Sequence, residues 1–309
     1  MNKQSSSLTN QDFVRLPQNQ TLADAMVRPS VSYWRDVLRR ITSDKVALIS
    51  FTFIMLITLV AIFAPILSPY SHETTDLLHT NLPPSAEHWF GTDSVGRDLW
   101  ARVWVGARVS LLIGLGGAIV PQFIGIFLGG LSGYFGGWVD MLIMRIIDVG
   151  VCIPSLVYVT LIMLWLDSGP VAIIIAIAIT GWMDSARIVR GRMLQFKNRE
   201  FVLAARTQGA SSTRIIFRHI LPNILGQQVV NISSAIPAAI FLEAYLSFIG
   251  LGIKSPMTSW GQLCQVGSEF YRLYPYQLFI PGVFISVTIL AFYLFGNCLR
   301  DALDPHLRD

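Results

Sequence analysis

The stretch 46-VALISFTFIMLITLVAIFAPIL-67 decides the fold class, because it runs through its whole length without a charged side chain. A helix needs about 20 consecutive apolar residues to cross a hydrocarbon layer about 30 Å thick. The whole sequence is 53% hydrophobic and 14% charged, whereas a soluble domain usually has about 25% charged residues. We therefore predict an integral membrane protein.

Further apolar runs follow this first one. They cover residues 109–139, 142–166, 171–183, 224–249 and 276–299. The run 171–183 is short and continues into charged sequence. Together the runs predict an all-α, multi-pass transmembrane helical bundle of about six spans.

These runs divide the chain into segments of different character. The predicted segments are a flexible cytosolic tail at 1–30, a cytosolic amphipathic segment at 31–45, the first transmembrane helix at 46–68, an extracytoplasmic loop at 69–108, a five-helix core at 109–299 that includes a cytosolic hairpin at 198–222, and a cytosolic C-terminal tail at 300–309. The first segment lacks the apolar middle of a signal peptide.

Lys and Arg residues gather in three places: before the first run, between the fourth and fifth runs, and after the last run. With six spans, these three places fall on the same side of the membrane. Cytosolic loops are enriched in Lys and Arg. We therefore expect both termini, and the basic segment between the fourth and fifth runs, to lie in the cytosol.

That basic segment, 199-REFVLAARTQGASSTRIIFRHILPN-223, has the pattern of two short helices. Gly209 suits a left-handed cap at the end of the first helix, and Ser211 or Ser212 can cap the second. We expect Pro222 to stop the second helix. Helices this short need a surface to pack on. The residue pattern leaves two surfaces open, namely anionic lipid and a groove on a cytosolic partner.

The same segment resembles the EAA motif of bacterial ABC importer permeases, which is Glu-Ala-Ala, three residues, Gly, nine residues and an ending that closes on Leu-Pro. Leu203 stands where the motif has Glu, and His219 stands where the general pattern has Ile. The resemblance implies that the hairpin couples to an ATPase subunit. The implied coupling residues are Leu203, Ala204, Ala205, Gly209, Arg214, Arg218, His219, Leu221 and Pro222.

Other motifs resemble the C-type permease of dipeptide and oligopeptide importers. They are FGTDSVGRDLWARVWVGARVSL at 90–111, VDMLIMRIIDV at 139–149, LSFIGLGIKSPMTSWG at 246–261 and LRDALDP at 299–305. With the hairpin, they extend from about residue 85 to the end of the chain. The resemblance implies the type I ABC importer permease fold and a place in the bacterial cytoplasmic membrane.

The resemblance also implies partners. They are a homologous B-type permease, two ATP-binding subunits and an extracytoplasmic peptide-binding protein, with an oligopeptide as substrate and no nucleic acid. The motif GLGIKS at 250–255 lacks the Gly-Lys-Ser/Thr order of a P-loop, so ATP and Mg are expected on the partner subunits and no cofactor on this chain. We expect a non-catalytic subunit. The alternatives are a related importer of dipeptides, nickel or glutathione, and a gradient-driven carrier.

Charged residues inside the apolar runs are candidates for function, because a charge in a membrane span is costly. They are Asp140, Arg145, Asp148, Asp184 and Glu243. Arg145 and Asp148 are three residues apart and can face one another on a helix, so a structural ion pair is favoured over a gating role. For Glu243 an interhelical hydrogen bond is favoured over a place in a cavity wall.

The extracytoplasmic loop contains GTDSVGRD at 91–98, which is rich in turn residues. Its candidate residues are Gly91, Asp93, Gly96, Arg97 and Asp98. A loop that packs against the start of the next helix is favoured, and contact with the peptide-delivery protein or the B-type permease is the alternative. His72, His79 and His88 share this loop at irregular spacing, so no metal site is expected.

Overall fold

The computed structural model describes residues 33–303, and every regular element within that range is helical. The elements are α2 (Tyr33–Ser43), α3 (Lys45–Leu67), α4 (Leu99–Phe135), α5 (Gly137–Val151), α6 (Ser155–Trp165), α7 (Pro170–Lys197), α8 (Glu200–Thr207), α9 (Ser212–Arg214), the π-helical turn η1 (Ile215–Ile220), α10 (Leu221–Phe248), α11 (Trp260–Glu269) and α12 (Tyr276–Leu303). The predicted tail 1–30 and the last residues of the predicted tail 300–309 lie outside the described residues.

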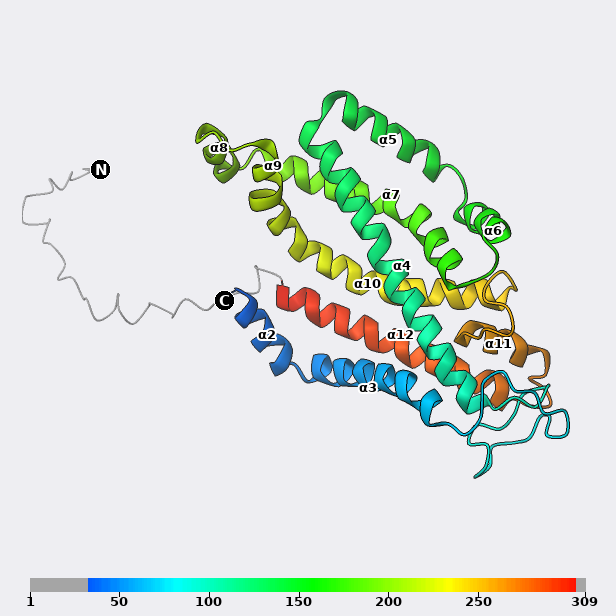
Figure 1. Ribbon diagram of the computed structural model, residues 1–309. Helices are drawn as coiled ribbons and strands as arrows, with labels where there is room; N and C mark the ends of the chain where they lie inside the picture. The colour runs from blue at the N-terminus through cyan, green and yellow to red at the C-terminus, as the bar shows by residue number, and fades with distance from the viewer. Residues whose placement is uncertain (1–32, 304–309) are drawn as a thin grey trace, which may run out of the picture.

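The long helices run side by side and form an elongated bundle (Figure 1). Among the described residues, five helices are long and apolar enough to cross a membrane, and α5 with α6 gives a sixth crossing if this bent pair is one span. The all-α, multi-pass prediction is therefore confirmed. We call the end of the bundle that carries α2, α8 and α9 the hairpin end, and the end that carries α11 and the 68–98 loop the loop end.

Helix α4 is the centre of the bundle and packs most closely against α7. A Cβ atom built on Gly125, Gly129 or Gly133 of α4 would lie less than 3 Å from atoms of α7. Small residues at a spacing of four allow two helix backbones to approach closely in lipid, where apolar burial drives little association. The glycine-rich part of the sequence therefore forms the contact between α4 and α7.

Several predicted boundaries are wrong. The predicted loop 69–108 ends at Asp98, because the Asp98 carboxylate accepts a hydrogen bond from Ala101 N (2.8 Å) and caps α4 ten residues before the expected core. The predicted span 171–183 continues to Lys197, since the charged side chains of its second half leave the helix intact. The predicted tail 300–309 begins inside α12, which runs to Leu303.

The predicted span 142–166 is not one straight helix. Helices α5 and α6 are separated by residues 152–154 and are bent by 88° relative to each other. Pro154 has no N–H to continue α5 and its ring would clash with the preceding turn. The backbone therefore leaves the helix before Pro154 and starts a new one after it.

A proline inside α3 is compensated differently. Pro65 cannot donate to the carbonyl of Ala61, which is four residues earlier in the helix. Arg108 of α4 donates to that carbonyl through Nε and to the carbonyl of Ile62 through Nη2. A guanidinium from a neighbouring helix thus satisfies the carbonyl that Pro65 leaves free, and α3 remains continuous across the proline.

Candidate functional site

The segment between α7 and α10 is a helical hairpin with a defined turn. Gly209 has φ +80°, and its N–H bonds to the carbonyl of Arg206 while Ala210 N bonds to that of Ala205 (both 3.0 Å). The predicted left-handed cap at Gly209 is confirmed. Of the two candidate serines, Ser211 caps the second helix, because its Oγ accepts from Arg214 N (3.3 Å).

The expectation that Pro222 stops the second helix is wrong. The chain continues from α9 through η1 into α10 without a break, and Pro222 occupies the first turn of α10. The missing proline N–H is tolerated because the turn before it is π-helical, with Leu221 N bonding to Ile216 O five residues back. The second helix of the hairpin is therefore the first part of a continuous helix that ends at Phe248.

One face of the hairpin is buried against the ends of α4 and α7. Val202, Ile215 and Ile220 are at most 1% exposed and form a cluster with Tyr134 and Met193. Lys197 strengthens this junction, because its Nζ donates to the Tyr134 carbonyl and lies 5.6 Å from the centroid of that ring. The hairpin thus has its own small core and a fixed attachment.

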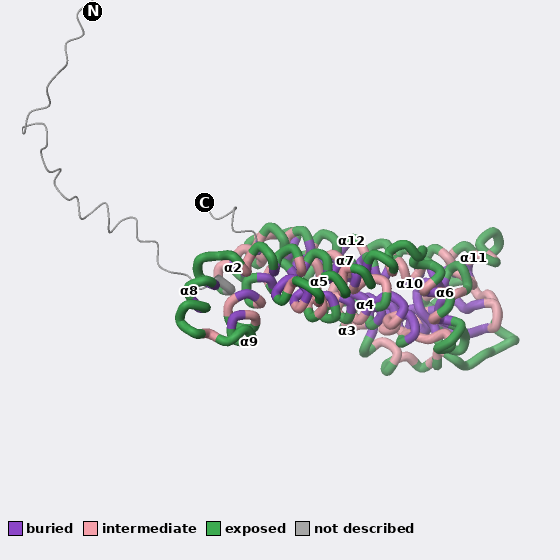
Figure 2. The backbone as a smooth tube through the Cα atoms, turned by 90° about the horizontal axis from the view of Figure 1, so that it is seen from above, coloured by how far each residue is buried: buried purple, intermediate pink, exposed green. Residues whose placement is uncertain are grey.

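The other face of the hairpin is exposed and projects from the bundle (Figure 2). Leu203, the residue at the position of the motif glutamate, is 46% exposed, and Phe217 is 65% exposed. The exposed motif residues are Leu203, Ala204, Gly209, Arg214, Arg218 and Pro222, whereas His219 and Leu221 are half-buried. Ala205 is the one coupling candidate that is buried.

Asp140 and Asp148 of α5 both pair with α7. Arg190 donates to Asp140 through Nε (2.5 Å) and Nη2 (2.6 Å), and Arg187 lies 3.0 Å from Asp148. The predicted pair of Arg145 with Asp148 does not form in the described part of the chain. An arginine of the neighbouring helix reaches Asp148 instead, which sequence spacing within α5 cannot reveal.

Two further candidates have opposite environments. Asp184 is exposed on α7 and forms no ion pair with a described residue. Glu243 of α10 is completely buried, where its carboxyl oxygens lie 2.8 Å from Ser110 Oγ of α4 and 2.9 Å from Ser247 Oγ. Ser110 also accepts from Trp260 N (3.2 Å). Glu243 therefore joins α4, α10 and the start of α11 inside the bundle.

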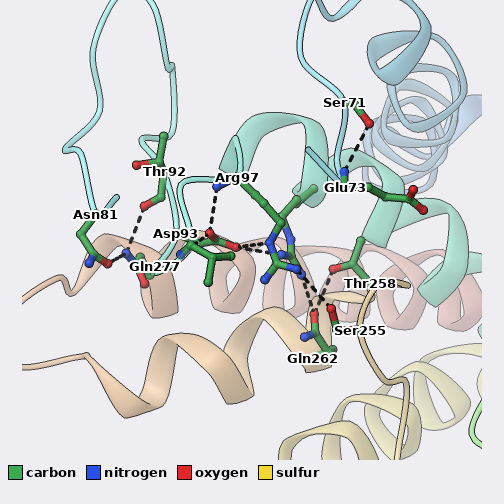
Figure 3. Close-up of polar contacts among 12 residues, drawn as sticks. Ser71, Glu73, Asn81, Thr92, Asp93, Arg97, Ser255, Thr258, Gln262 and Gln277 are labelled. Carbon is green, nitrogen blue, oxygen red and sulfur yellow. Dashed lines mark hydrogen bonds and ion pairs between the residues drawn. The ribbon is translucent and has the colours of Figure 1, made fainter. Parts of the chain in front are cut away.

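The loop end contains a buried polar network centred on Asp93 (Figure 3). Arg97 Nε lies 2.8 Å and Arg102 Nη1 2.7 Å from Asp93 Oδ2. Arg102 also donates to Gln262 Oε1 (3.1 Å), and Gln277 Nε2 to Asn81 Oδ1 (2.9 Å). The network joins the loop to α4, α11 and α12. Gln262 and Gln277 are too far from the loop in sequence for these contacts to be predicted.

The remaining residues of GTDSVGRD shape the loop around this network. Gly91 and Gly96 have φ values of +79° and +76°, and a Cβ atom on Gly96 would lie 1.8 Å from the carbonyl oxygen of Asp76. Asp98 accepts from Ala101 N and lies 2.9 Å from His88 Nδ1. These residues fix the loop against the start of α4, which is the packing expected from the sequence.

Residues 122–309 match the family described as the binding-protein-dependent transport system inner membrane component. This chain belongs to that family. Residues 32–84 also match the N-terminal transmembrane domain of oligopeptide transport permease C. The protein is therefore a non-catalytic, multi-pass permease of the inner membrane, and the family description implies a binding protein and an ATPase as partners. Membership excludes the alternative of a gradient-driven carrier.

Relatives of the permease agree with this assignment. It is 47% identical to the oligopeptide transport system permease protein OppC of Bacillus subtilis, over 93% of this chain and 94% of the relative. It is 43% identical to the dipeptide transport system permease protein DppC of the same organism, over 99% and 96%. OppC of Escherichia coli is 41% identical over 89% and 91%.

Proposed function

We propose that this permease forms half of the translocation pathway of an ATP-driven importer of oligopeptides, together with a homologous B-type permease. The main support for oligopeptides as the substrate class is the match of residues 32–84 to the N-terminal transmembrane domain of oligopeptide transport permease C. The 47% identity to an oligopeptide permease over nearly the whole chain supports it. An extracytoplasmic binding protein would deliver the peptide to the loop end.

The hairpin is the proposed contact with an ATP-binding subunit. Its inner face has a core of its own, while its outer face presents Leu203 and Phe217 among arginines. An apolar and basic helical surface suits insertion into a groove on a partner. In this proposal the hairpin end faces the cytosol, and both termini lie there.

The geometry also suggests how movement of the ATPase reaches the membrane. The second helix of the hairpin is continuous with α10, which reaches Phe248 near the loop end. The first helix follows α7 after a short turn at 198–199. In this proposal a displacement of the hairpin tilts α10 and α7 together. ATP bound to the distant ATPase subunit can then shift the conformation of the membrane helices.

The test is a pair of charge substitutions on the exposed face of the hairpin. Leu203→Asp and Phe217→Asp would be assembled with the B-type permease, both ATPases and the binding protein. Leu38→Asp on α2 is the matched control, since Leu38 is 62% exposed at the same end of the bundle. We expect the hairpin variants to lose co-purifying ATPase and peptide-stimulated hydrolysis, and the control to keep both.

Retention of the ATPase and of stimulated hydrolysis in both hairpin variants would contradict docking through this face. Loss of binding to anionic vesicles with normal ATPase binding would instead support the lipid alternative. Ala205 is not suitable for this test, because it is 9% exposed and a charge there would disrupt the hairpin core itself.

A second candidate function is the import of dipeptides, favoured by 43% identity to a dipeptide permease over 99% of this chain. Uptake of labelled dipeptide and pentapeptide by the reconstituted complex, each with the binding protein present, separates the two. Oligopeptide import predicts uptake of the pentapeptide. Exclusive uptake of the dipeptide would replace the proposed substrate class and leave the permease role unchanged.

A further inference from the structure

The break between α5 and α6 lies partway along the length of the bundle, beside the middle of α7. Gly150, two residues before the break, is level with Met183 of α7, because a Cβ atom on Gly150 would lie 2.6 Å from the Met183 sulfur. Met183 is about 20 Å along α7 from its start at Pro170, at a rise of 1.5 Å per residue. Measured from the start of the candidate span at Pro170, that depth falls inside a hydrocarbon layer about 30 Å thick.

The backbone at the break has free hydrogen-bond acceptors. The N–H groups of Cys152 and Ile153 turn back to carbonyls of α5 (both 3.2 Å), and Pro154 has no N–H. The carbonyls of Val151, Cys152 and Ile153 accept no backbone hydrogen bond within the described residues. Three adjacent carbonyl oxygens are thus available at membrane depth.

The break is also exposed. Every residue of 151–157 is exposed, and Val151 and Ile153 are 49% and 40% exposed. Irregular backbone does not face lipid within the hydrocarbon layer, and it is tolerated there only where protein or a water-filled cavity covers it. Something other than lipid must therefore cover these carbonyls in the membrane.

Charged neighbours favour water as the cover. Asp148, whose carbonyl accepts from Cys152 Sγ (3.2 Å), is exposed one turn before the break, and its pair with Arg187 of α7 is exposed with it. Asp184, the neighbour of Met183 on α7, is exposed as well. Carboxylates at this depth are costly in lipid and usually face the interior of a bundle or a water-filled cavity.

We propose that the α5–α6 break lines the water-filled translocation pathway, where the carbonyls of Val151, Cys152 and Ile153 bind N–H groups of the transported peptide. This inference rests on the proposed function as a peptide permease. Carbonyl oxygens can accept from any peptide backbone, so the contact is independent of the side chains of the peptide. The exposed Val151 and Ile153 side chains give apolar contact beside it.

Cys152 is a natural probe of this proposal, because it is exposed while Cys264 is buried and Cys298 is half-buried. The experiment uses the Cys264→Ala/Cys298→Ala variant, assembled with its partners in membranes and treated with a charged, water-soluble methanethiosulfonate. The control adds Cys152→Ala and Leu56→Cys, which places a thiol in the middle of α3, a helix whose 46–67 run has no charged side chain. Leu56 is 57% exposed.

We expect Cys152 to react about tenfold faster than the control thiol or more, because the thiolate is the reacting form and apolar surroundings suppress it. Pentapeptide with the binding protein should slow the reaction of Cys152 severalfold and leave the control unchanged. A reaction of Cys152 as slow as that of the control, in a complex that still imports peptide, would overturn the proposal. So would a fast reaction that peptide does not slow.

Failure of the proposed function gives a different result. An assembled complex that hydrolyses ATP but imports no peptide of any length contradicts peptide import. In that complex, rapid modification of Cys152 would still support a water-filled pathway at the break. Absence of protection by peptide would contradict the proposed contact between the break and the peptide.

Discussion

Arg190 of α7 holds Asp140 of α5 through two hydrogen bonds, with Nε 2.5 Å from Oδ1 and Nη2 2.6 Å from Oδ2. Ser132 of α4 donates to the same Oδ1 (2.5 Å), so this carboxylate joins three helices at the hairpin end. A bidentate arginine–carboxylate pair is strong and fixes geometry. The pair therefore sets the position of α5 beside the attachment of the hairpin.

Loss of this pair is expected to destabilise the permease. Arg190→Gln should lower the free energy of unfolding by about 1.5–3 kcal/mol, the range for hydrogen bonds to charged groups. Arg187→Gln is the matched control, because its pair with Asp148 is 41% and 54% exposed and exposed pairs contribute about 0–1 kcal/mol. The melting temperature of the purified complex measures both, and equal shifts would contradict the prediction.

Close packing of α4 against α7 predicts different costs for neighbouring glycines. A Cβ atom on Gly129 would lie 2.3 Å from the Ala186 carbonyl oxygen, whereas one on Gly130 would lie 3.6 Å from the Met193 methyl carbon. Gly129→Ala should therefore destabilise the protein by about 1–3 kcal/mol through overpacking, and Gly130→Ala should be tolerated. Thermal unfolding compares the two, and a tolerated Gly129→Ala would show that the helices can separate freely.

The Asp93 network predicts a severe effect at the loop end. Asp93→Asn leaves two buried guanidinium groups, Arg97 and Arg102, without their shared carboxylate. Breaking a buried ion pair on one side costs about 3–5 kcal/mol. We expect little folded permease in the membrane, as measured by protease resistance. Asp76→Asn is the control, because Asp76 is 49% exposed and its loss should leave the yield unchanged.

The turn of the hairpin predicts opposite effects of alanine at two glycines. Gly209 and Gly191 both have open space around a built Cβ atom, but only Gly209 has a positive φ, at +80°. Gly209→Ala should cost about 1–2 kcal/mol because the left-handed conformation is unfavourable for alanine. Gly191→Ala lies within α7 and should stabilise by about 0.5–1 kcal/mol. Hydrogen exchange of the hairpin amides measures the effect at Gly209, and exchange of the α7 amides measures the effect at Gly191; stabilisation by both substitutions would contradict the conformational argument.

The loop end contains a pH-dependent contact between Asp76 and His79 (2.7 Å). The hydrogen bond to Asp76 raises the pKa of His79, and the hydrogen bond to His79 lowers the pKa of Asp76. The contribution of His79 to the stability of the folded loop is complete below its unfolded pKa of about 6.5, and it is lost as pH rises through the folded pKa. The contribution of Asp76 to the same stability is complete above about pH 4 and is lost on acidification.

Amide exchange in the 69–98 loop should therefore be slower at pH 5.5 than at pH 8, after correction for the intrinsic dependence of exchange on pH. The effect should be small, because both side chains are about half exposed. His79→Gln should remove the difference. A difference that persists in this variant would assign the pH dependence to another group.

The sequence by itself determined the class of the protein and the position of its hairpin. An uninterrupted apolar run of this length crosses a bilayer as a helix, because a helix satisfies the hydrogen bonds of its backbone polar groups within its own segment. Local signals were equally reliable where the cause is local: Gly209 adopts a positive φ, and Ser211 caps the helix that follows it. These features depend on a few neighbouring residues and on the solvent.

Only the tertiary structure decided which charges pair and where helices continue or break. Asp148 pairs with Arg187 of another helix, and Asp93 with Arg102. Pro222 does not stop its helix, whereas Pro154 separates two. The same residue type has both outcomes because the cost of a missing N–H depends on the adjacent turn and on the groups that neighbouring helices supply. Such groups come from distant parts of the chain, and only the folded bundle brings them together.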